Sequence, residues 1–201
     1  MAKKVIGIVG SYRKDRVIDT AVSEILKGAE AHGAEISKIY LIDKHIEFCT
    51  NCRKCTQEKD VGIRAKCVHN DDMEDILSQV DSADAMVLGS PVNFFNVTAV
   101  TKRFIERLLP YVYWPWGAKM PKFRIKNTNK KAVIVTSSAA PAFFGRIFMR
   151  APLTTLKAAA KCMGAKVVQS LYFGPVAQSP DATLNEKSLR KAYKAGEKLV
   201  S

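Results

Sequence analysis

The sequence lacks a long hydrophobic run and is short of acidic residues. No stretch of 18 consecutive apolar residues occurs among its 201 residues, which excludes a transmembrane helix of ordinary length. Asp and Glu number only 19 against 32 Lys and Arg, so the formal net charge is +13. No internal repeat and no Gly/Ser-rich linker is present. With 47% hydrophobic and 25% charged residues, the composition is that of a globular protein, and we expect a single domain over residues 1–201.

The excess of positive charge favours an anionic partner, because a basic field attracts anions of any kind. The basic residues are spread along the chain instead of forming an arm or tract, which disfavours nucleic acid as the main partner. Small phosphorylated ligands and acidic redox proteins fit equally well. The N-terminal apolar run ends in Gly-Ser-Tyr-Arg-Lys-Asp-Arg and not in a small-residue cleavage site, so we expect no signal peptide and a cytoplasmic protein.

Short apolar runs and helical spacings of apolar residues alternate along the chain. Runs ended by turn residues predict five strands: Val5–Val9, Glu35–Leu41, Ala85–Leu88, Ala132–Val135 and Lys166–Phe173. Helical spacing predicts five helices: about Asp15 to Gly33, Asp71 to Ala83, Thr98 to Pro110, Pro152–Met163 and Asn185–Val200. In the second helix, Asp71 and Glu74 have the spacing of a capping box. A basic linker, Lys119 to Lys131, precedes the fourth strand.

This alternation predicts an α/β fold with a parallel sheet and helices on both faces. Five such units predict a flavodoxin-like, doubly wound sheet with strand order 2-1-3-4-5. A Cys-rich insertion, residues 43–70, follows the second strand. Ligands of such sheets bind beyond the carboxyl ends of the strands, where the strand order reverses. We therefore expect the site in the loops after the first, third and fourth strands.

The loop after the first strand, Gly10–Arg16, has the composition of an anion site. Ser11 and Arg13 can bind a phosphate directly, and backbone N–H groups around Asp15 to Ile18 complete the site at the start of a helix. The loop is neither a Walker A loop nor a three-glycine dinucleotide fingerprint. A solvated basic turn is the alternative interpretation.

Four cysteines lie within nineteen residues, with the pattern Cys49-x2-Cys52-x2-Cys55-x11-Cys67. In a cytoplasmic protein this clustering favours metal or redox chemistry over structural disulfides. Three Cys at a spacing of three match the cluster-binding run of ferredoxins. Zinc is the rival metal, although its usual pattern is two separated Cys-x2-Cys pairs, and free or disulfide-prone thiols are the third alternative. Cys162 fits a buried core residue.

Three segments carry a resemblance to known flavoproteins. Gly-Ser-Tyr-Arg-Lys at Gly10–Lys14 resembles the phosphate loop of the NADPH-dependent FMN reductase-like flavoproteins, and Gly89–Arg107 looks like their second flavin loop with the helix that follows it. The run Cys49-Thr-Asn-Cys52-Arg-Lys-Cys55, with Lys66-Cys67 and Asp71-Asp-Met73, is similar to the iron–sulfur flavoprotein branch. The resemblance covers nearly the whole chain, and the second loop with the cysteines is its most specific part.

The resemblance implies FMN and the residues that bind it. It assigns Ser11 and Arg13 to the phosphate, with backbone N–H groups from Val17 and Ile18, where the family often has Asn-Thr. Pro91, Val92, Asn93 and Phe94 would line the ring and ribityl chain, with Asn96 close by, and Ser137, Ser138 and Ala139 would form the third loop. Cys49, Cys52, Cys55 and Cys67 would hold a 4Fe–4S cluster, although the eleven-residue gap before Cys67 is longer than the branch usually has. The aromatic run Tyr111–Gly117 could cover the ring or pack against a second subunit.

The resulting hypothesis is an FMN-dependent oxidoreductase. Electrons would pass from NAD(P)H or a carrier protein to a quinone, a flavin or a protein acceptor, such as the acidic protein ferredoxin. No side chain has to be catalytic, because the flavin carries the chemistry. The resemblance further implies a homodimer or homotetramer. The alternatives are a non-enzymatic iron–sulfur flavoprotein electron carrier and a zinc-stapled binding module on the same fold.

Overall fold

The structure is a computed structural model that describes residues 2–126 and 129–201. Residues 127 and 128 of the predicted basic linker lie outside the described residues. The main sheet contains β1 (Lys4–Val9), β2 (Glu35–Tyr40), β3 (Ala85–Gly89), β6 (Lys131–Ser137) and β7 (Lys166–Phe173). The helices are α1 (Val17–Glu30), α2 (Met73–Ser82), α3 (Ala99–Glu106), α4 (Ala142–Phe148), α5 (Ala151–Cys162) and α6 (Glu186–Val200).

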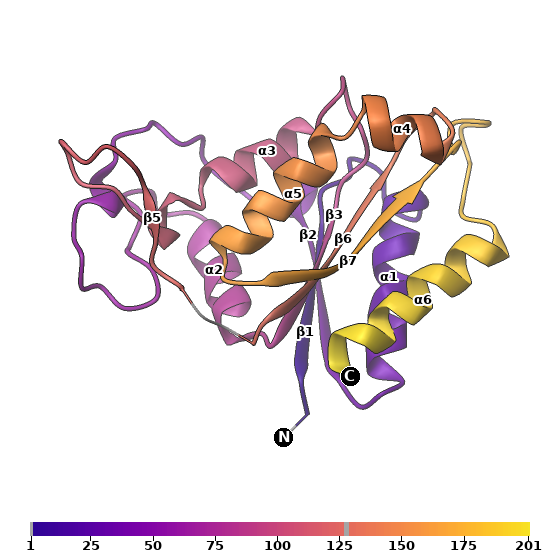
Figure 1. Ribbon diagram of the computed structural model, residues 1–201, viewed down its shortest axis with the longest axis horizontal. Helices are drawn as coiled ribbons and strands as arrows, with labels where there is room; N and C mark the ends of the chain where they lie inside the picture. Colours follow the sequence, from indigo (N-terminus) through magenta and orange to yellow (C-terminus); the bar gives the residue numbers. More distant parts are fainter. Residues whose placement is uncertain (1, 127–128) are drawn as a thin grey trace.

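The sheet is parallel throughout, with the order β2-β1-β3-β6-β7 (Figure 1). β1 is an interior strand next to the edge strand β2, and its Val5 pairs with Ile36 on one side and with Ala85 on the other. The first connection moves outward to β2, and the chain then crosses β1 to form β3. This confirms the predicted flavodoxin-like order and places the switch point between the carboxyl ends of β1 and β3.

Helices cover both faces of the sheet, and each face has its own apolar core. One core joins α1 and α6 to the sheet, and the other joins α2, α3 and α5 to the opposite face (Figure 1). α1 and α6 approach closely because both have a glycine at the crossing. A Cβ on Gly196 would lie 1.9 Å from the carbonyl oxygen of Ile25, and one on Gly28 would lie 2.1 Å from that of Tyr193. None of the described helices is both long and apolar enough to cross a membrane.

The helix ends follow the predicted signals in part. Thr98 caps α3, since its side chain accepts a hydrogen bond from the amide of Thr101, and Asn185 caps α6 in the same way. The predicted capping box at α2 is wrong. Asp71 accepts a hydrogen bond from the amide of Met73, but Glu74 pairs with Arg64 and does not return to the helix end. A partner outside the helix therefore outweighs the local pattern.

A short hairpin and one α-helix are among the elements absent from the sequence-based prediction. The aromatic segment and the linker form a small antiparallel hairpin, β4 (Val112–Tyr113) with β5 (Lys122–Phe123). α4 precedes α5 and carries four exposed large apolar side chains. Strands of two residues and a helix without a polar face give no periodic signal, which is why neither was predicted.

Candidate functional site

Buried hydrogen bonds tie the loops after β1 and β3 together. The amide of Gly10 donates to the carbonyl of Gly89 at 2.7 Å. The carbonyl of Gly10 accepts from the hydroxyls of Thr98 at 2.7 Å and of Thr101 at 3.0 Å. The hydroxyl of Ser90 in turn accepts from the Thr101 hydroxyl at 3.1 Å. These contacts fix the two loops relative to each other at the switch point.

The first loop places Ser11 and Arg13 in one turn beside the start of α1. The Ser11 hydroxyl donates to the carbonyl of Arg13, whose amide donates back to that hydroxyl at 3.1 Å. The Arg13 guanidinium donates to the carbonyl of Pro180 at 3.1 Å. Arg16 forms an ion pair with Asp181. The loop after β7 thus lies against the loop after β1.

The N-terminus of α1 has no side-chain cap within the part of the chain that the structure describes. Val17 and Ile18, the first residues of α1, are buried, so they offer backbone N–H groups. An uncapped helix N-terminus beside a hydroxyl and an arginine can bind a phosphate. This arrangement fits the phosphate of FMN.

The buried carboxylate of Asp19 holds this loop in place through hydrogen bonds. The sequence pattern does not indicate this role. The carboxylate accepts from the amide of Asp15 at 2.7 Å and from Lys38 at 3.0 Å, and the Tyr40 hydroxyl donates to it at 3.1 Å. Burial acts to raise the pKa of Asp19, but these donors outweigh it and hold the pKa below its ordinary value. The bond to Asp15 stabilises a backbone with φ of 56°, which bends the chain into the helix.

The second loop ends in a tight turn with two phenylalanines at its tip. The amide of Asn93 donates to the carbonyl of Asn96 at 2.7 Å, and the reverse bond is 3.1 Å. Phe94 and Phe95 between them have φ of 44° and 65°. This left-handed region favours glycine or asparagine, so a bulky residue there is strained. Phe94 is 93% exposed, which makes the turn tip an apolar surface at the rim of the switch point.

Hydrogen bonds connect the second loop to β6 and to α5. The third loop forms hydrogen bonds within itself and to β7. Pro91 and Val92 are half-buried, and the amide of Val92 donates to the carbonyl of Ser137 at 2.8 Å. Asn96 accepts from Thr155 on α5 through its side chain at 3.2 Å. Buried Ser138 donates to Phe173 through its amide and to Ala140 through its hydroxyl, whereas Ala139 is exposed. All predicted flavin-site residues thus lie in loops or element ends at one edge of the sheet.

The four clustered cysteines lie in the segment between β2 and α2, and all are free thiols. Burial, together with the nearby thiols of Cys67, Cys49 and Cys52, raises the pKa of the Cys55 thiol to about 11. No three side chains of metal-ligand type in the described residues stand in a metal-binding arrangement.

The hairpin β4–β5 packs on this segment. The Arg53 guanidinium lies between the rings of Trp114 and Trp116, 4.1 Å from each centroid. Arg124 donates to the carbonyls of Cys55 and Lys59. The aromatic run, for which the sequence left a flavin cover or a subunit contact open, has its tryptophans on the cysteine segment.

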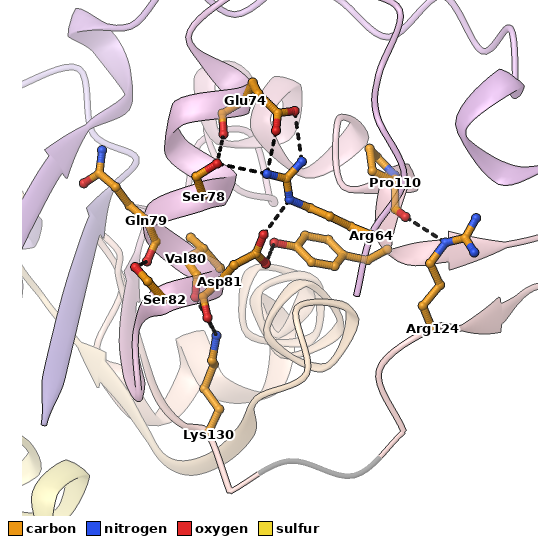
Figure 2. Close-up of polar contacts among 11 residues, drawn as sticks. Arg64, Glu74, Ser78, Gln79, Val80, Asp81, Ser82, Pro110, Arg124 and Lys130 are labelled. Carbon is orange, nitrogen blue, oxygen red and sulfur yellow. Dashed lines mark hydrogen bonds and ion pairs between the residues drawn. The ribbon is translucent and has the colours of Figure 1, made fainter. Parts of the chain in front are cut away.

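A second set of polar contacts anchors the eleven-residue gap before Cys67. Arg64 donates to both oxygens of Glu74 and, at 2.6 Å, to Asp81 (Figure 2). Tyr111 donates to the other oxygen of Asp81 at 2.7 Å. The Arg64 side chain is only 10% exposed, so these pairs are better shielded from solvent than ordinary surface ion pairs. The gap is thereby attached to α2 and to the segment before the hairpin.

Buried donors without partners accompany the cysteines. Nε of Arg53, Nε of Arg107 and Nε2 of His69 are buried and have no hydrogen-bond partner among the described residues. Arg53 lies between Cys52 and Cys55 in the chain, and Arg107 pairs with Asp71, which follows Cys67 by four residues. Unpartnered buried donors are costly and call for an acceptor. The four thiols themselves do not form a metal-binding arrangement among the described residues, so these nitrogens define a buried polar surrounding of the cysteines and not a preformed metal site.

A doubly wound parallel sheet with this strand order and three loops at its switch point defines the flavodoxin-like class of α/β proteins. Solved structures agree on the fold. An NAD(P)H:quinone oxidoreductase from Methanothermobacter marburgensis has a TM-score of 0.74 at 15% identity, over 99% of this chain and 100% of that one. A flavodoxin from the domain Archaea has a TM-score of 0.54 at 12% identity, over 98% of this chain and 96% of that one.

The family follows from the sequence comparison. The family profile of NADPH-dependent FMN reductase matches residues 3–174, and the chain belongs to this family of flavin oxidoreductases. An iron–sulfur flavoprotein of Archaeoglobus fulgidus is 38% identical over 112 residues, which are 56% of this chain and 48% of the relative. One of Methanocaldococcus jannaschii is 37% identical over 107 residues, 53% of this chain and 52% of the relative. The matches thus span about half the length of these curated relatives.

Proposed function

We propose that this chain is an FMN-dependent oxidoreductase whose cysteine segment holds a 4Fe–4S cluster. The observation that carries the FMN part is the uncapped N-terminus of α1 beside Ser11 and Arg13, at the switch point of the sheet. The free thiols and unpartnered donors of the cysteine segment support the cluster. FMN supplies hydride and single-electron transfer, and the cluster supplies single-electron transfer.

The side chains of the three loops bind and orient the flavin. Ser11, Arg13 and the amides of Val17 and Ile18 hold the phosphate. Pro91, Val92, Asn93 and Phe94 form the ring wall with Asn96 beside them, and Ser137, Ser138 and Ala139 close the third side. None of these side chains has to move a proton, because the flavin carries the reaction.

We expect Arg13→Ala to weaken FMN binding by about 10- to 100-fold. Losing one hydrogen bond to a charged group costs about 1.5–3 kcal/mol. Fluorescence titration of flavin-free protein measures it. Lys14→Ala is the matched control, because Lys14 is in the same loop but pairs with Asp43 at 2.6 Å. Unchanged affinity in the Arg13 variant would remove Arg13 from the phosphate site.

The electron donor is proposed to be NAD(P)H or a carrier protein, and the acceptor a quinone, a flavin or a protein. Steady-state oxidation of NADH and NADPH, measured with each acceptor class, tests the enzyme against the alternative of a pure electron carrier. Turnover with either nicotinamide supports the reductase. Reduction by a carrier protein without any nicotinamide turnover supports the carrier.

We expect the protein to form a homodimer or homotetramer through the face of α4. Phe143, Phe144, Ile147 and Phe148 are all exposed, and the rings of Phe144 and Phe148 stack at 6.2 Å. An apolar helix face of this kind marks an interaction surface. Light scattering after size exclusion should give the mass of a dimer or tetramer. Phe148→Ser should shift the mass toward that of a monomer. Ile42→Ser, a change at an exposed apolar residue outside α4, is the control and should have no effect. A monomeric wild type contradicts the proposal.

A further inference from the structure

A groove lined by lysines lies between the hairpin β4–β5 and the turn from α5 to β7. Its volume is about 950 Å³. The lysines come from β5, from the linker after it, from α5 and from the start of β7, and they are Lys122, Lys126, Lys157, Lys161 and Lys166. No aspartate or glutamate is among the described residues that line the groove. Positive charge is therefore concentrated here, and two of these lysines belong to the basic linker predicted from the sequence.

The fold does not neutralise this charge. Within the part of the chain that the structure describes, none of the five lysines forms an ion pair. Lys157 and Lys161 are one helical turn apart on α5, a spacing at which like charges repel. By contrast, Lys102 on α3 has the same spacing to Glu106 and pairs with it. The lysines of the groove repel one another, and a bound anion would relieve that repulsion.

The groove also has an apolar floor that is held in place. Phe123 is 37% exposed, and Ile125 and Val167 are half-buried in the same lining. Ile125 packs so closely on Gly164 that a Cβ there would lie 2.7 Å from its Cγ2 atom. Arg124, between the two floor residues of the hairpin side, donates to three backbone carbonyls outside the hairpin. The floor is thus part of the packed protein, while the lysines form the rim.

A second hollow, on the α6 side of β7, shows that lysines alone do not make such a site. Lys187 and Lys191 line it, but so do Glu24 and Glu197. The charges of that hollow are mixed, and acidic side chains of the protein lie beside its lysines. The groove at α5 differs because its lining combines unpaired lysines with apolar residues and contains no described acidic residue.

The groove lies at the end of the sheet opposite the proposed flavin site. Lys166 begins β7, whereas the carbonyl of Phe173, the last residue of β7, accepts from the amide of Ser138 in the third loop. At about 3.3 Å per residue, β7 separates these two ends by roughly 23 Å. A ligand that fills the groove is therefore distinct from the flavin.

We propose that this groove binds a small organic polyanion of the nucleoside polyphosphate type, with its apolar or aromatic body on Phe123 and its anionic groups on the surrounding lysines. The volume is within the range of small-molecule sites, which is about 300–1,000 Å³. An ionic polymer would not need the apolar floor, and an apolar ligand would not need the lysines. The Lys161 ammonium lies 5.7 Å from the centroid of the Phe123 ring, so one ligand can contact both.

The test is calorimetric titration with ATP, in the absence of divalent cations and with excess FMN present throughout. Inorganic triphosphate provides the charge without the ring, and adenosine provides the ring without the charge. The variant Lys157→Gln/Lys161→Gln removes two charges from the groove. Lys187→Gln/Lys191→Gln is the matched control, because it removes two lysines at the same spacing on α6 and leaves the same net charge.

We expect ATP to bind wild type and the double variant at the groove to bind it about tenfold more weakly or worse. The α6 control should change the affinity by less than about twofold. Phe123→Ala should weaken ATP about fivefold and leave triphosphate unchanged, because only ATP has a ring to stack. The chemical denaturation midpoint of Lys157→Gln/Lys161→Gln should not fall, since a repulsion between like charges is removed, so weaker binding will not reflect unfolding.

Four results would overturn the proposal. The first is no ATP binding at low salt. The second is an equal loss in both double variants, which would reduce the effect to net charge. The third is binding of ATP only when FMN is left out, which would place ATP in the flavin site. The fourth is a heparin fragment that binds through the groove lysines while Phe123→Ala has no effect on ATP, which would make the groove a surface for polymers. The lysine variants decide the question whether or not the protein binds FMN.

Discussion

Gly10→Ala should destabilise the fold by about 3 kcal/mol and weaken FMN binding by about 100-fold. A Cβ at this position would lie 1.9 Å from the hydroxyl of Thr101 and 3.1 Å from the carbonyl oxygen of Gly89. Neither neighbour can move freely, because the Thr101 hydroxyl is bonded to Gly10 and Ser90 inside the protein. The loops after β1 and β3 must therefore separate, and both contribute to the flavin site.

Chemical denaturation and FMN titration measure the two effects of Gly10→Ala. Gly33→Ala is the control, since a Cβ there meets nothing within 4 Å and only the backbone φ of 81° opposes it. It should cost about 1–2 kcal/mol and leave FMN affinity unchanged. Adding Thr101→Ala to Gly10→Ala removes the clashing oxygen, so the two changes should cost less together than the sum of each alone. Additive costs would show that the close approach is not the cause.

The arrangement of the sheet could be predicted because its signals are local. Each predicted strand is a short apolar run followed by turn residues, and β7 has the predicted bounds Lys166–Phe173. β6 extends beyond the predicted Ala132–Val135 to Lys131–Ser137, since its last residues still pair with β7. Alternation of strands and helices then determines the order, because right-handed crossovers leave few topologies.

The side-chain contacts that hold the loops of the site in place could not be predicted, because they join residues that are distant in the sequence. Asp71 and Glu74 have a capping-box spacing, but their partners are Arg107, 36 residues away, and Arg64 in the cysteine gap. Asp19 supports the phosphate loop through Lys38 and Tyr40 on β2. A local pattern shows which side chains can pair, while the fold decides which of them meet.

Ion pairs and hydrogen bonds attach the long gap before Cys67 to the rest of the protein. A gap of eleven residues in a free loop would raise the entropy cost of bringing Cys67 to the other three cysteines. Arg64, bonded to Glu74 and Asp81, and Arg124, bonded to Cys55 and Lys59, hold the gap against the rest of the protein. These contacts lower the conformational entropy of the gap in the folded protein.

Serine in place of any one of Cys49, Cys52, Cys55 or Cys67 should abolish iron binding and leave FMN binding intact. A 4Fe–4S cluster needs a thiolate for each iron, and a hydroxyl is a poor substitute because it remains protonated at neutral pH. Wild type purified without oxygen should contain about four iron atoms and four sulfides per chain. The flavin should be retained, since its proposed contacts come from the loops after β1, β3 and β6.

Cys162→Ser is the matched control, because it makes the same change at a cysteine outside the segment. Cys162 is buried on α5, its sulfur lies 3.7 Å from the carbonyl oxygen of Leu108, and burial raises the pKa of its thiol to about 12. We expect this variant to keep its iron and to lose some stability only. Metal, sulfide and flavin are counted on the same samples to separate the alternatives. Zinc without sulfide would show that the four cysteines form a structural zinc site. No metal, together with thiols that react on titration, would show that they are redox thiols. Because the unpartnered nitrogens of Arg53, Arg107 and His69 can donate to the sulfur of an anionic cluster, we expect iron with sulfide.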